Sequence, residues 1–408
     1  MPNTGRLVIV GAGQAAFAAA AKLRALKDDR PITIIGAEDV LPYQRPPLSK
    51  KYLLGDMSFD RLLFRPEQWY ADNRVEFHLS TWVEEIRRER KQVLLHDGTV
   101  LDYGTLLLAT GSTPRQLPAA IGGTLKGVHV MRDKRDADHL AEAMLPGRRV
   151  LIIGGGYIGL EAAAVARHRG MEVTLIEMAD RILQRTAARE TADIIRAIHQ
   201  AHDVVIREKT GLDHLIGRDG QVTAARLSDG TVVDVDCVIV GIGVVPNDQL
   251  ADVAGLEVKN GIVVDEFGRT SDPSIFAAGD CASLPWQEGR IRFESVQNAV
   301  DQAEAIALVI AGGDAAYRPK PWFWSDQYDV KLQIAGFNLG YDQTLLRADG
   351  RKGTHSVWYF KSGAFVSVDA INDATAYIVG RKMLELGINP DKGVLADPNS
   401  DLKQLLRT

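Results

Sequence analysis

Short apolar runs followed by glycine recur along the chain, and they predict strands that are buried on both faces. Residues 7–10 are entirely apolar and lead into a glycine-rich segment at 11–16 and an alanine-rich stretch. The same order returns at residues 150–153, which precede the glycines of segment 154–159 and a second apolar stretch of helical length. Because buried strands of parallel sheets lack polar alternation, each run predicts a strand–glycine turn–helix unit.

Each unit continues into a second apolar strand that ends near an acidic residue. Residues 32–35 lead to Glu38, and residues 172–176 lead to Glu177. An acid about 20 residues beyond a glycine-rich turn is typical of a dinucleotide-binding β–α–β unit, in which the turn approaches a pyrophosphate and the acid binds a ribose. One such fingerprint is a weak signal, whereas two in the same setting are a strong one. For Glu38, a solvated loop acid is the alternative.

The repeat extends beyond these units. Asp-Gly turns begin at Asp97 and Asp229, and each is followed by an apolar run that ends in glycine, at Gly111 and Gly243. The spacing from aspartate to glycine is the same in both halves. Two fingerprints, two turns and two glycine-ended strands in one order predict two copies of one nucleotide-binding domain.

Two dinucleotide sites in one chain indicate two different dinucleotides, an FAD that stays bound and a nicotinamide cofactor that exchanges. Glu177 would accept hydrogen bonds from a ribose diol and repel a 2′-phosphate, which favours NADH over NADPH. Arg181 and Arg185 follow closely in the sequence. Either arginine could admit a phosphate, so NADPH stays open at this point.

The predicted fold is α/β, with two Rossmann-like dinucleotide-binding domains of the glutathione-reductase class plus a C-terminal α+β domain. The first copy lacks its last strand until residues 270–280, so we expect the second copy to be inserted into the first. Residues 331–335, 357–360 and 364–368 predict antiparallel strands, and 374–386 predict a helix. The predicted boundaries are 1–114 with 247–318 for the FAD-binding domain, 115–246 for the NADH-binding domain and 319–408 for the C-terminal domain.

Composition excludes several classes of protein. The chain has 408 residues and a net charge of −5, a balance that gives no general affinity for nucleic acid. Its two cysteines, Cys237 and Cys281, exclude a disulfide framework, a cysteine-ligated metal site and a C-x-x-C redox centre. Residues 1–6 lack a signal-peptide pattern, and no apolar run is long enough to span a membrane, so we expect a cytoplasmic protein.

These motifs resemble those of the FAD-dependent, NADH-using ferredoxin reductases of bacterial oxygenase systems, the putidaredoxin reductase and biphenyl dioxygenase reductase type. The resemblance covers essentially the whole chain, and its most specific parts are the proline-rich stretch 41–50 and the tryptophan stretch 321–327. It also includes residues 11–16, 109–111, 154–161, 279–280 and 294–298. Many relatives carry two acids after the second strand; Ala37 takes the first of these places and leaves Glu38 alone.

The resemblance implies roles for individual residues. Lys50 would lie near flavin N5 and pair with Glu161, and Trp324 would approach the isoalloxazine. Asp280 would hold the ribityl chain, and Glu294 would lie near the nicotinamide. Without the resemblance, Lys50 is a surface lysine, Glu161 an exposed helix residue and Trp324 a core aromatic. The residues implied to bind the two cofactors are Gly11, Gly13, Ala15, Ala16, Glu38, Arg45, Lys50, Val83, Ala109, Thr110, Gly111, Arg132, Gly279, Asp280, Val296, Gly154, Gly156, Tyr157, Ile158, Gly159, Glu177, Arg185, Gly243 and Glu294.

The implied activity is that of an oxidoreductase, a flavoprotein that takes hydride from NADH onto FAD and passes single electrons to a two-iron ferredoxin feeding a bacterial oxygenase. Arg65, Arg381 and Lys382 are candidates for a basic patch that binds an acidic ferredoxin. An NADH oxidase or peroxidase is an alternative, which the lack of cysteine in 41–50 argues against. A redox-sensing binding protein like apoptosis-inducing factor is the other. The sequence leaves the ferredoxin, the oxygenase, its substrate and the oligomeric state open.

No metal site is expected. His199 and His202 are three residues apart on a predicted helix and could ligate together, but no third ligand is evident. The basic run 87–91 is expected to be a solvated turn between strands rather than a binding patch.

Overall fold

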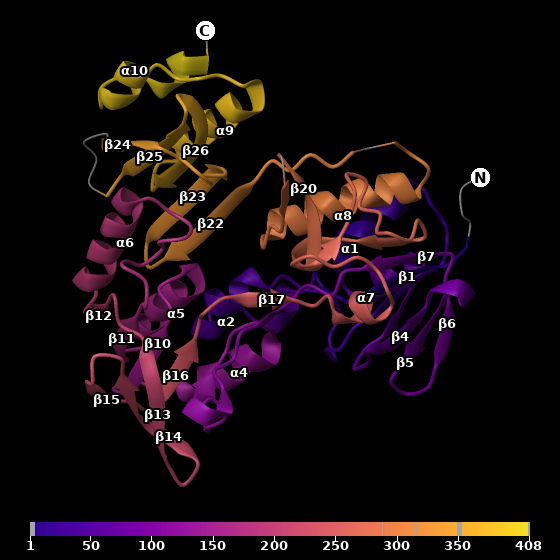
Figure 1. The fold of residues 1–408 in the computed structure, drawn as a ribbon, viewed down its shortest axis with the longest axis horizontal. Helices are drawn as coiled ribbons and strands as arrows, with labels where there is room; N and C mark the ends of the chain where they lie inside the picture. Colours follow the sequence, from indigo (N-terminus) through magenta and orange to yellow (C-terminus); the bar gives the residue numbers. More distant parts are fainter. Residues whose placement is uncertain (1–4, 288, 315, 349–352, 407–408) are drawn as a thin grey trace. The chain divides into compact units, whose positions relative to one another are not determined.

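The computed structural model describes residues 5–287, 289–314, 316–348 and 353–406 (Figure 1). Residues 1–4 of the segment examined for a signal peptide lie outside this part. The chain forms two compact units. Unit 1 holds residues 1–44, 59–113 and 244–319, and unit 2 holds residues 45–58, 114–243 and 320–408. The three predicted domain boundaries stay a prediction.

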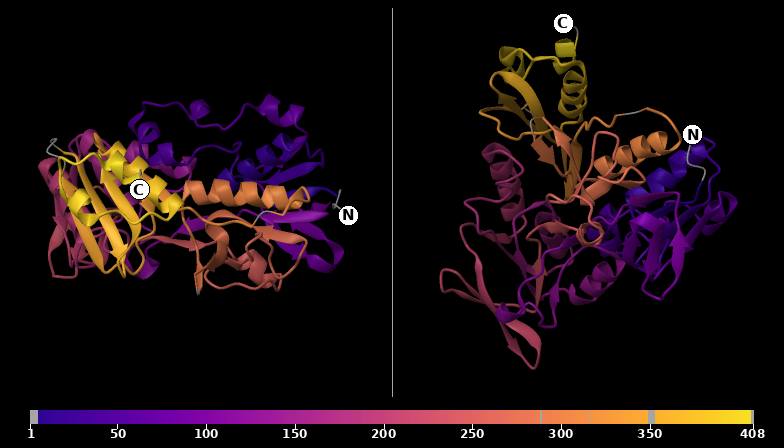
Figure 2. Two further views of the ribbon diagram at one scale, coloured as in Figure 1. Left: turned by 90° about the horizontal axis from the view of Figure 1, so that it is seen from above. Right: turned by 45° about the vertical axis from the view of Figure 1, so that its right-hand side comes forward.

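Unit 1 is built on a five-stranded parallel sheet whose inner strands are completely buried. The strand order is β19 (Ile275–Ala277), β7 (Thr105–Leu108), β1 (Leu7–Val10), β2 (Ile32–Ile35) and β3 (Val75–His78). Helices α1 (Gln14–Ala25) and α8 (Val296–Ile310) lie side by side against it (Figures 1 and 2). Ala16, Ala19 and Ala20 of α1 are fully buried, so small side chains let the helix approach closely.

Smaller elements complete unit 1. Asp97 lies in the turn of an antiparallel sheet that also contains the basic run, in which Arg88 contacts Asp272 at 3.1 Å. This sheet comprises β4 (Val83–Arg87), β5 (Gln92–Leu95) and β6 (Val100–Asp102), with η3 (Arg88–Arg90) between β4 and β5. The others are β8 (Ser112–Pro114) with β17 (Val244–Pro246), the sheet of β18 (Ile262–Val263), β20 (Ala282–Trp286) and β21 (Gly289–Ile291), and the helices η2 (Phe59–Arg61), α3 (Glu67–Asp72), α7 (Gln249–Val253) and η5 (Gly279–Cys281).

Unit 2 contains a second five-stranded parallel sheet. Its order is β12 (Val204–Arg207), β11 (Glu172–Ile176), β10 (Arg149–Ile153), β16 (Cys237–Val240) and β9 (Val128–His129). Its helices are α4 (Lys134–Ala143), α5 (Tyr157–His168) and α6 (Arg189–Ala201), and α5 packs against β10 and β11. The antiparallel sheet of β13 (Leu212–Arg218), β14 (Gln221–Leu227) and β15 (Val232–Asp234) and the short helices η1 (Pro46–Ser49), α2 (Lys51–Leu54) and η4 (Ala119–Ile121) complete this part.

The C-terminal part of unit 2 is an antiparallel sheet covered by helices (Figure 2, left). Its strand order is β22 (Trp322–Gln327), β23 (Val330–Gly336), β26 (Ala364–Ile371), β25 (His355–Lys361) and β24 (Gln343–Ala348). Helix α9 (Ala374–Leu386) packs on β23 and β26, and α10 (Lys392–Ala396) and η6 (Leu402–Leu406) follow it. Trp358 and Phe360 fill the core. The predicted strands and helix are confirmed.

The prediction of two related copies is confirmed by the sheet orders. Strands β3-β2-β1-β7 of unit 1 correspond one by one to β12-β11-β10-β16 of unit 2. The fifth strand differs between the two sheets. Strand β19 comes after the other strands of its sheet in the sequence, whereas β9 comes before the other strands of its sheet. None of the helices in the described part of the chain is long and apolar enough to cross a membrane.

Candidate functional site

The glycine turn of unit 1 forms a cradle in front of helix α1. Gly11 has φ of +106°, and a Cβ there would lie 2.2 Å from the Ala109 carbonyl oxygen. Only glycine fits, because both the backbone angle and the space exclude a side chain. A Cβ on Gly13 would have no atom within 4 Å, so the space before the helix is open. Ala15 and Ala16 begin the buried face of α1. Free backbone N–H groups at such a helix start suit a pyrophosphate.

Unit 2 repeats this cradle in front of α5. Gly154 has φ of +107°, and a Cβ there would lie 2.4 Å from the Gly241 carbonyl oxygen. Gly156 again faces open space. A Cβ on Gly159 would lie 2.1 Å from the Gly154 carbonyl oxygen, so this third glycine is required for helix packing. Tyr157 and Ile158 form the first turn of α5. Both cradles therefore fit a dinucleotide pyrophosphate.

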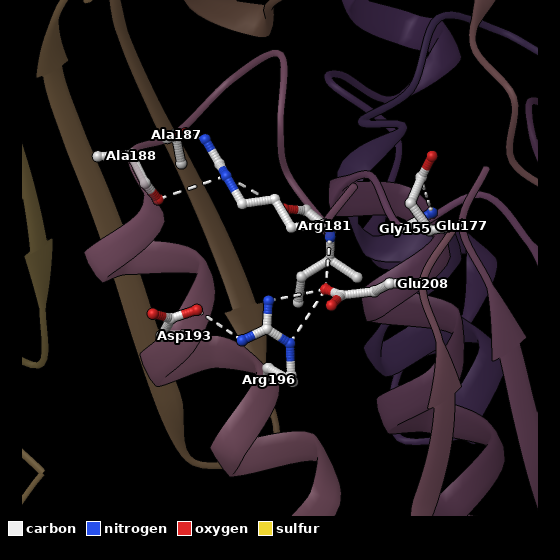
Figure 3. Close-up of polar contacts among 9 residues, drawn as sticks. Gly155, Glu177, Arg181, Ala187, Ala188, Asp193, Arg196 and Glu208 are labelled. Carbon is white, nitrogen blue, oxygen red and sulfur yellow. Dashed lines mark hydrogen bonds and ion pairs between the residues drawn. The ribbon is translucent and has the colours of Figure 1, made fainter. Parts of the chain in front are cut away.

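The acids that follow the second strands make different contacts. Glu38 Oε2 accepts a hydrogen bond from the Tyr43 hydroxyl at 2.7 Å. Glu177 binds backbone groups instead, since one carboxylate oxygen accepts from Gly155 N–H at 2.7 Å (Figure 3) and the other accepts from Ala179 N–H at 2.8 Å. Glu177 thus stands at the glycine turn of unit 2 and is held there by its backbone.

The two arginines that could admit a phosphate are placed differently. Arg181 is only 9% exposed and donates to the carbonyl oxygens of residues 182, 187 and 188, the second of these at 2.8 Å (Figure 3). Its guanidinium is used to hold its own loop. Arg185 is exposed, and its Nη2 lies 3.8 Å from where a Cβ on Gly243 would be. Gly243 follows β16, whereas Glu177 follows β11, on the other side of the central strand.

Several residues implied to bind FAD meet at the carboxyl edge of the unit 1 sheet. Thr110 Oγ1 donates to the Asn247 carbonyl at 2.6 Å, and Asn247 Nδ2 donates to the Thr110 carbonyl at 2.8 Å. Asn247 N–H also donates to the Gly111 carbonyl. Ala109 extends β7 by donating to the Val10 carbonyl. Asn247 was missed by the sequence analysis, because nothing local in the sequence marks its pairing with residue 110.

A second group of these residues lies where α1 and α8 begin. A Cβ on Gly279 would lie 3.5 Å from the Cβ atoms of both Ala15 and Ala299, so the two helices converge there. Asp280 Oδ2 accepts from the Ser112 hydroxyl at 2.8 Å. Val296 is the first residue of α8. The strand-end carboxylate and two helix starts are thereby brought together within unit 1.

For the remaining candidate residues of unit 1, the contacts described are with residues outside the candidate set. Glu294 lies just before the start of α8 and pairs with Arg292 Nη2 at 2.7 Å. Val83 begins β4 and is buried. Arg65 lies over the rings of Phe17 and Trp69, with its guanidinium carbon 5.7 and 5.9 Å from their centroids.

Lys50 and Glu161 form a buried ion pair within unit 2. Lys50 Nζ lies 2.6 Å from Glu161 Oε2, and the two side chains are 18% and 2% exposed. The Ser49 hydroxyl donates to the same oxygen at 2.9 Å, and the Ser325 hydroxyl donates to Oε1 at 2.7 Å. Buried charges in proteins are stable only when paired and hydrogen-bonded, as here. The sequence analysis found the lysine and glutamate but missed both serines.

Aromatic residues of β22 lie on both faces of this strand. The rings of Trp322 and Trp324 stack on one face with centroids 5.5 Å apart, and both are half-buried. Phe323 points the other way and contacts Tyr157 of α5, with centroids 4.9 Å apart. Trp324 is therefore a half-exposed residue on a strand that packs against α5.

Other candidate residues of unit 2 have structural partners. Arg45 Nη1 donates to the Arg132 carbonyl at 3.0 Å. Arg381 and Lys382 of α9 are about half exposed, and each lies 3.4 Å from a carboxylate oxygen of Glu385. Their hydrogen bonding and charge hold the pKa of Glu385 below its usual range. Arg65 belongs to unit 1, so the three candidate basic residues are divided between the units.

Neither cysteine is arranged for thiol chemistry. Both are buried, and burial raises the pKa of the Cys281 thiol and raises that of Cys237 to about 12. His199 Nε2 lies 2.8 Å from Gln327 Oε1, and His202 Nδ1 lies 2.8 Å from the Ile198 carbonyl. Among the described residues, no group of three or more histidines, cysteines or acids could hold a metal.

Comparison with known proteins finds related families and relatives over nearly the whole length of the chain. Residues 5–303 match the family described as pyridine nucleotide-disulphide oxidoreductase, and residues 322–406 match the reductase C-terminal family. The chain is 42% identical over 405 residues to a ferredoxin–NAD(P)(+) reductase of Sphingomonas sp., covering 98% of this chain and 97% of that one. It is 41% identical to rhodocoxin reductase of Rhodococcus erythropolis, covering 97% and 93%.

A solved structure extends the comparison. Putidaredoxin reductase, in its covalent complex with putidaredoxin, superposes with a TM-score of 0.95 at 37% identity, covering 99% of this chain and 98% of that chain. The chain therefore belongs to the pyridine nucleotide-disulphide oxidoreductases, which bind FAD and NAD(P)H, and within them to the FAD-dependent ferredoxin reductases of bacterial oxygenase systems, the putidaredoxin reductase type.

Proposed function

We propose that this protein oxidises NADH with a tightly bound FAD and passes the electrons one at a time to a two-iron ferredoxin that feeds an oxygenase. The observation that carries the proposal is the pair of glycine cradles, one per unit, each with open space where a pyrophosphate would lie. FAD, when bound, supplies the chemistry that converts a two-electron donor into a one-electron donor. The protein supplies binding, orientation and charge.

Unit 1 is the proposed site of FAD. Gly11, Gly13 and the start of α1 would hold the pyrophosphate, and Glu38 would bind the adenosine ribose. Asp280, already fixed by Ser112, would hold the ribityl chain. The residues fit this role because two helix starts and one carboxylate converge beside an unfilled glycine turn.

Unit 2 is the proposed site of NADH. Glu177 is fixed at the glycine turn, where its charge would repel the 2′-phosphate of NADPH. Arg181 is engaged with backbone carbonyls and is not available to offset that repulsion. The position of Arg185 beside Gly243 further supports a preference for NADH.

Lys50 and Glu161 are the proposed charged pair beside the reacting ring, with Trp324 as a stacking residue. Glu161 would hold the lysine in one orientation, and the lysine would favour negative charge that develops on its neighbour. Burial of the pair strengthens this interaction, since water screens it little.

The alternatives make different predictions about acceptors. An NADH oxidase or peroxidase of the cysteine-dependent kind needs an accessible thiol, whereas both cysteines are buried. A redox sensor would change oligomeric state, so a dimer that forms on size-exclusion columns only with NADH would favour that role. We further propose a cytoplasmic location, where NADH is available.

Anaerobic reduction of cytochrome c by NADH tests the proposal. The purified yellow protein is assayed with and without each member of a panel of two-iron ferredoxins, with a rubredoxin as a one-iron comparison. Strong acceleration by one ferredoxin supports the proposed role. Rapid flavin bleaching without acceleration by any two-iron ferredoxin contradicts the proposed acceptor and leaves only NADH oxidation by FAD.

A further inference from the structure

A continuous chain of side-chain hydrogen bonds ends on the Glu161 carboxylate. Ser325 Oγ lies 2.7 Å from Glu161 Oε1, and Gln327 Nε2 lies 3.0 Å from Ser325 Oγ. His199 Nε2 lies 2.8 Å from Gln327 Oε1, and the Tyr328 hydroxyl lies 3.1 Å from His199 Nδ1. All of these residues belong to unit 2, and we name Ser325, Gln327, His199 and Tyr328 the Glu161 network.

The direction of every bond in this network follows from the carboxylate. A carboxylate only accepts, so the Ser325 hydroxyl donates to Glu161 and its oxygen accepts from the Gln327 amide. The amide oxygen then accepts from Nε2–H of His199, whose Nδ1 accepts from Tyr328. If the amide were reversed, the Ser325 proton would be used on Gln327, leaving two oxygens 2.7 Å apart with no proton between them.

The state of the histidine agrees with this direction. Burial lowers the pKa of His199 to about 4, so the imidazole is neutral and has one N–H to donate. Ser325, Gln327 and His199 are all buried, and they come from strand β22 and helix α6. A buried polar chain in which each member is satisfied holds its end group in one orientation.

The two oxygens of Glu161 thereby have separate uses. Oε2 receives Lys50 and Ser49, and Oε1 receives only the Glu161 network among the bonds described for this carboxylate. Rotation of the carboxylate would break the contact with Ser325. Because the two oxygens are rigidly joined, a donor fixed on one also fixes the direction in which the other meets the lysine.

We propose that Ser325, Gln327 and His199 are positioning residues for NADH oxidation, which hold the Glu161 carboxylate in the orientation that binds Lys50. The C-terminal sheet and helix α6 then control a charged pair that they do not themselves contain. This inference rests on the proposed role of Lys50 and Glu161 in hydride transfer, and the experiment separates the two.

The sharpest variant is Gln327→Glu, which keeps the size of the side chain but replaces the amide donor by an acceptor. The Ser325 hydroxyl then faces two carboxylates, and the bond to Glu161 is lost in part. Anaerobic stopped-flow measurements are expected to show flavin reduction by NADH slowed about 10-fold, with the NADH dissociation constant changed by less than about twofold. Ser325→Ala should slow flavin reduction to a similar extent. Ser325→Thr, which keeps the hydroxyl, should retain the native rate.

The flavin midpoint potential gives a readout other than activity. A lysine that is less well oriented stabilises added negative charge less, so Gln327→Glu and Ser325→Ala should shift the potential to more negative values. Ser367→Ala is the matched control, since Ser367 is a buried serine of the same sheet that donates to the Ala335 carbonyl at 2.9 Å. It should lower the melting temperature comparably and leave rate and potential unchanged.

Three outcomes overturn the inference in distinguishable ways. Glu161→Gln is the benchmark: if it slows reduction while the network variants do not, the positioning role is wrong and the proposed function stands. If Glu161→Gln itself changes neither rate nor potential, the proposed role of the pair is wrong. If ¹⁵N-histidine spectra, assigned with His199→Gln, show at pH 7 a proton on Nδ1 of His199, the direction of the network is wrong.

Discussion

The glycine turns of the two units have nearly the same backbone, with φ of 106° at Gly11 and 107° at Gly154. The Asp-Gly turns of the accessory sheets also agree, since Thr99 N–H and Thr231 N–H each donate to the preceding aspartate at 2.9 Å. The two units differ in the acid after the second strand. Glu38 is bonded by a tyrosine, whereas Glu177 is bonded by the glycine turn itself. Features that set the backbone are shared, whereas the contacts of the two acids expected to bind the ligands differ.

The largest effects are expected from substitutions in the two glycine turns, and each substitution should abolish the binding of a different cofactor. Gly11→Ala and Gly154→Ala each place a Cβ within 2.4 Å of a carbonyl oxygen at a backbone angle that only glycine tolerates. Gly11→Ala should yield protein without flavin. Gly154→Ala should yield yellow protein that no longer binds NADH, with an affinity loss of about 100-fold or more. The ratio of flavin to protein absorbance and an anaerobic NADH titration measure the two effects.

A matched pair of variants sharpens this test. Ala16→Gly and Gly159→Ala exchange the third small residue of the two turns, and only the second creates a clash, at 2.1 Å. Ala16→Gly should therefore cost only about 1 kcal/mol of stability, with flavin content preserved. Loss of flavin from Gly154→Ala or Gly159→Ala would mean that the two cradles are not independent sites.

Two buried titratable groups should make unit 2 respond to pH in opposite directions. Burial lowers the pKa of His199 from 6.5 to about 4, so the unfolded chain takes up this proton first and stability falls as the pH drops through that range. Burial raises the pKa of Asp369 from 3.8 to about 6, so the folded chain takes up that proton first and stability rises as the pH drops from 6 to 3.8. Each effect amounts to about 3 kcal/mol.

Single variants should uncover these opposing effects. As the pH is lowered from 7 to 4.5, His199→Gln should gain stability relative to the native protein, and Asp369→Asn should lose stability relative to it. In each case the difference in melting temperature from the native protein should change by about 6–10 °C over this pH range. Tryptophan fluorescence reports on both units, since three of the six tryptophans, Trp322, Trp324 and Trp358, belong to unit 2, whereas flavin release would report on unit 1 alone. If the melting temperatures of both variants changed with pH in the same way as that of the native protein, the assignment of these pKa shifts to His199 and Asp369 would be wrong.

Much of the fold could be predicted because the repeat is local in the sequence. Buried strands, glycine turns and Asp-Gly turns each leave a pattern within a few residues, and two copies reinforce each other. The fifth strands could not be matched in this way. Strand β9 has two residues, Val128 and His129, which is too short for any period to show, and its place at the sheet edge is set by pairing with β16.

The candidate site shows the same difference between residues marked by a local pattern and residues marked only by long-range contacts. Lys50 was found because it ends a specific proline-rich stretch, and Glu161 because it follows the second fingerprint. Ser49 and Ser325 were missed, since a serine in a strand or a short helix is ordinary until its partner is known. Contacts such as Ser325 with Glu161 join residues 164 positions apart, and no local pattern records them.

A smaller effect distinguishes the two strand-end acids. Glu177→Gln retains one acceptor but places an NH₂ group against a backbone N–H, either that of Gly155 or that of Ala179. NADH affinity should fall about 10-fold, and the preference for NADH over NADPH should narrow. The matched change Glu38→Gln should leave both nucleotide affinities unchanged. Fluorescence titrations with NADH and NADPH give the four dissociation constants, and an unaltered preference in Glu177→Gln would show that this acid does not select the nucleotide.

The smallest expected effect concerns Arg381 and Lys382 of α9, the candidate charges for binding a ferredoxin. Arg381 and Lys382 share Glu385, which offsets part of their charge, and all three side chains are solvent-exposed enough to be screened. Reversing both to glutamate should raise the KM for ferredoxin several-fold at low ionic strength and leave NADH–ferricyanide turnover unchanged. Glu385→Gln should act in the opposite direction and lower the KM about twofold. Because the two changes alter charge at one place with opposite sign, equal KM values in both variants would exclude this surface as the ferredoxin contact.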